Sequence, residues 1–156
     1  LASESNDSGT SKRVLGTILT WMAERKTLVF LVATANDIQN LPPELMRKGR
    51  MDEIFFVDLP SDSVRKEILI IHLKKRELDP QNFDLDKISA ACEGFSGSEI
   101  EQVIVSGFYS VIGGYKQLTT EILLDEIKRT KPLSVIMAEN IESMRAWALG
   151  RTVPAN

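Results

Sequence analysis

The sequence predicts an α/β fragment, the end of a parallel sheet, followed by an all-α region. Two observations lead to this fold class. The apolar runs "LVFLVA" (28–33) and "EIFFVDL" (53–59) are typical of strands in a parallel sheet that is covered on both faces. After Pro60 the apolar residues follow helical spacing instead. Two strands alone cannot make a stable covered sheet, so the first part is expected to be the end of a larger layer.

Composition narrows the class of protein. Of the 156 residues, 43% are hydrophobic and 26% are charged, which is ordinary for a globular protein. The net charge of -3 argues against nucleic acid as a partner. Cys92 is the single cysteine, so an internal disulfide and a multi-cysteine metal site are excluded, and no metal site is expected. No apolar run is long enough to cross a bilayer, so no membrane partner is expected.

The first 60 residues are expected to form a helix and two strands. Residues 1–10 are polar and predict a flexible lead-in. A helix is expected from Ser11, because apolar residues recur at helical spacing through Met22. Two prolines follow the first strand, and one helical turn closed by Gly49 is expected before the second strand.

The remaining chain is expected to be helical, and its helix starts are marked by capping residues. Ser61 is a typical N-cap, Ser96 and Glu99 fit a capping box, and Thr119 or Thr120 begins a later helix. The apolar side of the first of these helices is expected at Val64, Ile68, Ile71 and Leu78. The expected helices span 61–78, 86–93, 96–112, 120–131 and 134–149. The predicted domains are 1–60 and 61–150, with a tail at 151–156.

Four motifs occur in a fixed order: "ATAND", "LPPELMRKGRMDEIFFVDLP", "RKEILIIHLKK" and "CEGFSGSEIEQVI". Together they resemble the second half of an AAA-type ATPase module over about residues 12–150. The resemblance implies the end of a P-loop NTPase parallel sheet followed by a helical lid. The segments "RKGRMDEIFFVDLP", "GFSGSEIEQ" and "SMRAWALGR" are similar to uncharacterised AAA proteins encoded by a hypothetical reading frame of chloroplasts and cyanobacteria.

Asn36 stands at the end of the first apolar run. A side-chain amide at a strand tip can orient the water that attacks a γ-phosphate, and the resemblance implies this sensor-1 role. The alternative is an Asn that caps a turn, since Asn and Asp favour turns.

Arg50 stands just ahead of the second apolar run, after Gly49. The resemblance implies an arginine finger, which stabilises charge on the phosphoryl group of a neighbouring subunit. Arg47 matches a position that is structural or peripheral in the family, and Glu53 replaces a second arginine of the family pattern. The alternative for this segment is a solvated basic turn.

Ile68 and His72 are four residues apart and therefore share one helix face. The resemblance implies that both contact the adenosine, together with Gly97 and Ser98, where glycine permits a close approach of the base. The alternatives are a packed core histidine at position 72 and simple helix capping at Ser96 and Glu99.

The 156 residues contain no Gly-Lys pair, and therefore no P-loop of the form G-x-x-x-x-G-K-[ST]. No Asp-Glu pair follows an expected buried strand, which is the position at which such a pair would bind Mg²⁺. This chain alone is expected to hold no tightly bound cofactor and to have no ATPase activity. The resemblance implies that a longer parent binds ATP and Mg²⁺, forms a ring or other homo-oligomer, and remodels a protein substrate in a bacterial cytoplasm or a plastid stroma. The alternative function is a nucleotide-independent interaction module with an AAA-like lid.

Overall fold

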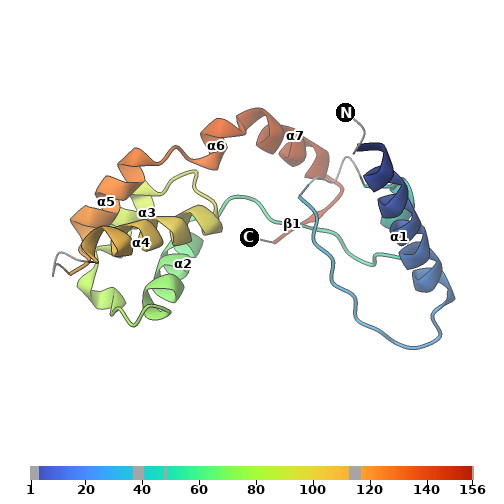
Figure 1. Ribbon diagram of the computed structural model, residues 1–156, viewed down its shortest axis with the longest axis horizontal. Coiled ribbons are helices and arrows are strands. Elements are labelled where there is room, and N and C mark those ends of the chain that lie inside the picture. The colour runs from blue at the N-terminus through green and yellow to red at the C-terminus, as the bar shows by residue number, and fades with distance from the viewer. Residues whose placement is uncertain (1–3, 37–40, 48, 113–116, 156) are drawn as a thin grey trace. The chain divides into compact units, whose positions relative to one another are not determined.

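A computed structural model describes residues 4–36, 41–47, 49–112 and 117–155, with side chains from Arg13 onward. The chain divides into two compact units, Leu1–Ile54 and Phe55–Asn156. Figure 1 shows the elements of each unit. The first unit contains a long helix, and the second is dominated by helices. The predicted fold class, an α/β fragment followed by a helical lid, is confirmed.

The first unit contains α1 (Glu4–Glu24) and a short 3-10 helix, η1 (Pro43–Met46). The flexible lead-in predicted for residues 1–10 is wrong, because α1 already begins at Glu4. The expected turn closed by glycine is present, and Gly49 has a φ of 90°.

The strand predicted at 28–33 is not present. The segment has no regular secondary structure, and it pairs with no strand in the described part of the chain. Leu28 and Phe30 are almost fully exposed, and Val32 is 73% exposed. A strand exists only where a neighbour accepts and donates its backbone hydrogen bonds, and both described strands lie in the second unit.

The second unit is built mainly from helices. Four of them, α2 to α5, pack around one apolar core. Figure 1 shows α6 and α7 continuing from α5 toward the C-terminal strand. The elements are β1 (Phe55–Phe56), α2 (Asp62–Lys74), η2 (Pro80–Asn82), α3 (Leu85–Ala91), α4 (Gly97–Val111), α5 (Thr120–Arg129), α6 (Leu133–Ile136), α7 (Ala138–Ala148) and β2 (Val153–Pro154).

Three of the predicted helix starts are confirmed by side-chain caps. Ser61 accepts a hydrogen bond from the backbone N–H of Val64, and Thr119 caps α5 in the same way. The capping box at the start of α4 is complete. Helix α4 ends at Val111, close to the expected end at residue 112, and the two glycines that follow, Gly113 and Gly114, lie outside the described residues. The single helix expected at 134–149 is two helices, because the chain leaves helical geometry at Met137.

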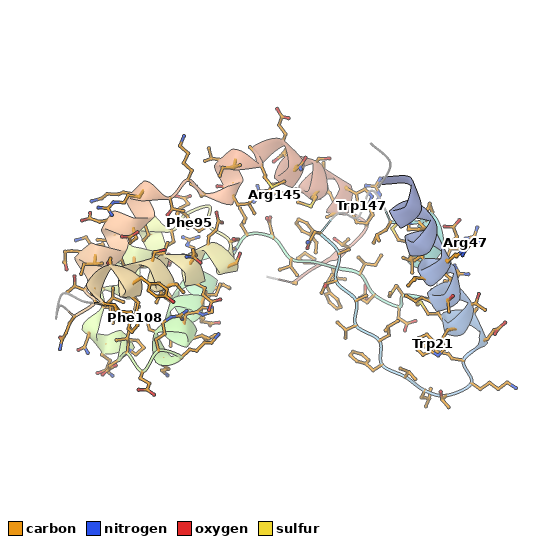
Figure 2. All side chains as sticks on the ribbon, viewed as in Figure 1. Trp21, Arg47, Phe95, Phe108, Arg145 and Trp147 are labelled. Atoms are coloured by element: carbon orange, nitrogen blue, oxygen red, sulfur yellow. The ribbon has the colours of Figure 1, made fainter. Side chains whose placement is uncertain are left out.

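The core lies between α2, α3, α4 and α5, and it includes Phe95, which is labelled in Figure 2. The expected apolar side of α2 is partly wrong, because Ile71 is 59% exposed while Leu69 and Leu73 are fully buried. The buried residues of α2 are shifted along the sequence by about one position from the expected ones, because α2 packs against both α3 and α4. The buried cluster is Leu69, Leu73, Phe83, Ile88, Cys92, Phe95, Ile100, Val103, Ile104, Val111, Leu118, Leu123 and Ile127.

A two-stranded parallel sheet joins the start and the end of the second unit. Phe55 pairs with Val153 and Phe56 with Pro154, and the N–H of Ala155 donates to the carbonyl of Phe56 at 3.0 Å. The strand expected at 53–59 is therefore much shorter than predicted. Arg145 of α7 (labelled in Figure 2) donates to both carboxylate oxygens of Asp58, at 2.8 and 3.0 Å, and so ties α7 to the chain after β1.

Candidate functional site

Helices α2 and α4 pack side by side and bring together two of the predicted site residues. A Cβ on Gly97 would lie 3.5 Å from Cδ1 of Ile68, so this first residue of α4 is in van der Waals reach of the Ile68 side chain. Ile68 is only partly buried and packs at the edge of the core. Because glycine has no side chain, one face of Ile68 is not covered by α4 at this position.

One turn further along both helices, His72 faces Glu101. The Nδ1 atom of His72 lies 3.2 Å from Oε1 of Glu101, and 19% of the His72 side chain is exposed. The angle at this contact is outside the range of a hydrogen bond. Nδ1 is therefore a buried polar atom that has no hydrogen bond among the described residues. A buried polar atom in this state is costly unless a small rotation of the ring aligns the contact.

Glu101 is held by two further basic side chains. Nη2 of Arg76 donates to Oε1 at 3.3 Å, and Nζ of Lys75 lies 3.6 Å from the same atom. Arg76 also donates from Nη1 to the carbonyl of His72 at 3.0 Å, which fixes it at the end of α2. The hydrogen bond from Arg76 lowers the pKa of Glu101 below its usual value, with smaller contributions from the neighbouring positive charges.

Ser98 is exposed on the first turn of α4. Its hydroxyl oxygen lies 3.1 Å from that of the N-cap residue Ser96. In the same capping box, Oε2 of Glu99 accepts from the N–H of Ser96 at 2.7 Å. The other oxygen of Glu99 accepts from the N–H of Leu133 at 2.8 Å, so one carboxylate anchors the starts of both α4 and α6.

Arg65 anchors the start of α2 and was missed by the sequence analysis. It is 9% exposed. Its Nε donates to the carbonyl of Ser89 at 2.9 Å, and its Nη1 donates to the carbonyl of Pro60 at 3.0 Å. These bonds join the chain before α2 to the end of α3. A charged residue on the same helix face as two leucines, one and two turns further along, is the sequence signal that could have suggested this buried role.

Asn36 and Arg50 belong to the first unit, and the structure describes them separately from the α2–α4 site. Asn36 is exposed, shortly after the segment 28–33. The Nη1 of Arg50 donates to the carbonyl of Glu44 in η1 at 2.8 Å. Glu53, at the position of the second family arginine, is exposed.

The chemistry of these side chains fits the adenosine part of a nucleotide better than its phosphates. Ile68 offers an apolar surface and His72 a partly exposed ring with polar nitrogens. The 156 residues contain no P-loop, the motif that holds the phosphates of ATP. Within the described ranges, no cluster of three or more His, Cys, Asp or Glu side chains could hold a metal ion. No helix in the described part of the chain is long and apolar enough to cross a membrane.

The helical bundle of the second unit is the lid that the resemblance to an AAA-type module implies. The chain belongs to the AAA family: residues 1–59 match the family described as "ATPase family associated with various cellular activities (AAA)". This membership confirms the resemblance drawn from the four sequence motifs.

Similar proteins support the same family. The chain is 48% identical over 143 residues to "Uncharacterized AAA domain-containing protein ycf46" of Pyropia yezoensis, which covers 91% of this chain and 29% of that protein. The protein of the same name in Guillardia theta is 46% identical, covering 92% of this chain and 28% of that protein. A proteasome-activating nucleotidase of Saccharolobus islandicus is 37% identical over 118 residues, covering 75% of this chain and 29% of that protein. The chain thus spans less than a third of the length of these relatives.

Proposed function

We propose that this chain supplies the sensor and lid portion of an AAA ATPase, and that the longer protein binds and hydrolyses ATP in an oligomer to remodel a protein partner. The observation that supports the lid role best is the α2–α4 contact. It places Ile68 against Gly97 and His72 one turn further along, although the two helices are separate in the sequence. An apolar side chain beside a glycine gives a flat nucleobase room to approach, and the imidazole adds a polar contact.

In this proposal Ile68, His72, Gly97 and Ser98 contact the adenosine. Asn36 orients the attacking water or a phosphate oxygen in its own subunit. Arg50 acts in a neighbouring subunit, where its guanidinium stabilises the charge that develops on the transferring phosphoryl group. Its present hydrogen bond to the carbonyl of Glu44 is to a neutral acceptor, and a phosphate would form a stronger, charge-assisted bond.

ATP and Mg²⁺ are the cofactors of this proposal, and the longer protein would hold them with a P-loop that these 156 residues do not contain. The partner is proposed to be a protein, which the similarity to a proteasome-activating nucleotidase favours. A bacterial cytoplasm or a plastid stroma is the proposed location, and the algal relatives favour the plastid.

The roles of Asn36 and Arg50 are tested by measuring ATP turnover of the longer protein. Arg50→Ala is expected to lower kcat about 10³-fold or more, because a finger arginine stabilises the transition state. Asn36→Ala is also expected to lower kcat. The 156-residue chain is expected to show no turnover above a blank. Arg47→Ala is the matched control, because Arg47 is a neighbouring exposed arginine with no proposed catalytic role.

Mixing the two inactive variants tests whether Arg50 acts in trans. A subunit with Arg50→Ala retains its own Asn36, and a neighbour with Asn36→Ala can supply the missing Arg50. Mixed oligomers are therefore expected to recover part of the turnover. No recovery in oligomers shown to contain both variants would contradict action in trans, and turnover by the 156-residue chain alone would contradict the proposed division of the site.

A second candidate function, a nucleotide-independent interaction module, is favoured by exposed apolar side chains. Phe30 is 94% exposed, and Val135 and Ile136 of α6 are 65% and 66% exposed. Such surface is typical of contacts with other proteins. The native reading frame separates the two functions: a P-loop and a "DE" strand upstream support the ATPase, whereas a frame without them supports the interaction module.

A further inference from the structure

We propose that Glu101 is a positioning residue for His72. It holds the imidazole in the tautomer that carries its proton on Nδ1, which leaves Nε2 to accept a hydrogen bond from a hydroxyl or amino group of a bound adenosine. The ligand part of this inference rests on the proposed function. The tautomer part rests on the α2–α4 geometry alone.

The first support is the burial of one ring edge. Nδ1 of His72 is buried and has no aligned hydrogen bond among the described residues, yet it lies 3.2 Å from Oε1 of Glu101. The exposed 19% of the side chain therefore belongs to its other atoms, of which Nε2 is the polar one. Glu101 is the acceptor at hydrogen-bond distance from Nδ1, and a modest ring rotation would align the pair.

The second support is the ionised state of Glu101. Arg76 donates one hydrogen bond to Oε1 of Glu101 and another to the carbonyl of His72. A carboxylate held by an arginine remains an acceptor at neutral pH and cannot donate to Nδ1. A neutral imidazole has one donor and one acceptor nitrogen, so a proton on Nδ1 makes Nε2 the acceptor.

The remaining charged groups near His72 do not oppose this arrangement. Lys75 and Arg76 are donors only and both approach Oε1 of Glu101, which keeps them paired with the carboxylate. Gly97, one turn before Glu101 on α4, has no side chain that could compete for the ring. A purely structural role for Glu101, as an ion-pair link between α2 and α4, predicts no preference between the two tautomers.

The imidazole tautomer can be read directly, because His72 is the single histidine of the chain. The experiment is to measure the two ring ¹⁵N chemical shifts of the 156-residue chain at about pH 8.5, well above the ordinary imidazole pKa of about 6.5. The expected result is a population dominated by the Nδ1–H form. Glu101→Ala is expected to shift it to the Nε2–H form, which a free imidazole prefers in water.

Two further variants make this result specific. Glu101→Met keeps the approximate size of the side chain and removes both carboxylate oxygens, and it is expected to shift the tautomer in the same direction if Glu101→Ala unfolds. Glu121→Ala removes an exposed glutamate from α5 and is expected to leave the tautomer unchanged. An Nε2–H population in the unmodified chain, or shifts that no Glu101 variant changes, would overturn the inference.

Nucleotide binding by the longer protein tests the ligand part separately. Glu101→Ala is expected to raise the Kd for ADP about three- to tenfold, which corresponds to one weakened hydrogen bond. Adding it to His72→Ala is expected to change Kd no further, because Glu101 acts through His72. An additional loss in the double variant would overturn the positioning role. An unchanged Kd in His72→Ala, with the tautomer shift intact, would instead contradict the proposed adenosine contact.

Discussion

Gly97 and Gly107, both in α4, differ in which atoms an added Cβ would contact. A Cβ on Gly97 would be in ordinary contact with Ile68, at 3.5 Å. A Cβ on Gly107 would lie 2.9 Å from Cδ2 of Leu123 and 3.0 Å from Cδ1 of Leu118, inside the core. A side chain at position 107 therefore requires Leu118 and Leu123 to move, whereas one at position 97 requires no movement. The expected role of Gly107 is therefore packing, and the expected role of Gly97 is to leave room for a ligand.

Gly97→Ala is expected to leave the free energy of unfolding within about 0.5 kcal/mol of the original, because the added methyl group fits. Gly107→Ala is expected to cost about 1–3 kcal/mol by overpacking. Chemical denaturation of both variants measures this. In the longer protein, Gly97→Ala is expected to weaken ADP binding several-fold. If Gly97→Ala destabilised the chain as much as Gly107→Ala, packing rather than a ligand would explain this glycine.

Single residues also show which features could be predicted from the sequence and which could not. Ser61, Thr119 and the Ser96–Glu99 capping box were predictable because each cap acts within three residues of the chain. The pairing of Glu101 with His72 and Arg76 was not, because nothing local specifies which helix face a residue on α4 will meet on α2. The predicted roles of Asn36 and Arg50 rest on family resemblance and stay predictions.

At the scale of elements, helices were predicted better than strands. Helix hydrogen bonds are internal, so the apolar spacing and caps of α2 to α5 were enough to locate them. The apolar run at 28–33 has the composition of a strand but no partner among the described residues. Conversely, β2 consists of Val153 and Pro154, which carry no recognisable strand pattern and pair only because β1 lies beside them.

The ion pair between α7 and the chain after β1 predicts a pH dependence. Burial by itself raises the pKa of Asp58, but hydrogen bonds from Arg145 and from the N–H of Leu59 outweigh it, so the pKa lies below its usual value. The stabilisation is therefore present above the unfolded-state pKa of about 3.9, and it is lost as the pH falls through the lower folded-state value.

Thermal unfolding of Asp58→Asn and of the original chain, followed from about pH 6 to about pH 2.5, measures this loss. The original chain is expected to be the more stable at pH 6, and the difference is expected to vanish at the acid end. Asp125→Asn is the control, because its pair with Lys128 is exposed on α5 and exposed pairs contribute little. A difference that does not change with pH would show that the charge of Asp58 is unimportant.

At the scale of the whole chain, the exposed segment 28–33 is a surface through which we expect two copies of the chain to associate. Leu28, Phe30 and Val32 are the most exposed of its apolar residues, and they alternate with the less exposed Val29 and Leu31. An exposed apolar segment that pairs with no strand in the described part of the chain can pair with a second copy.

The 156-residue chain is therefore expected to self-associate in concentrated solution. Val32→Lys is expected to weaken the association, because a charge blocks edge-to-edge pairing. Val135→Lys introduces the same charge at a similarly exposed residue of α6 and is expected to have little effect. Sedimentation velocity over a concentration series measures both variants. A monomer at every concentration of the unmodified chain would contradict this expectation.

The parallel pairing of Phe55 with Val153 has a topological consequence. The polypeptide that leaves β1 and the polypeptide that returns at β2 run next to each other, at the spacing of neighbouring strands, about 4.8 Å. The helices α2 to α7 therefore lie between two points of the chain that are close together in space. Such a module can be grafted into a surface turn of another protein, or have its ends joined and new ones opened elsewhere, without stretching its interior.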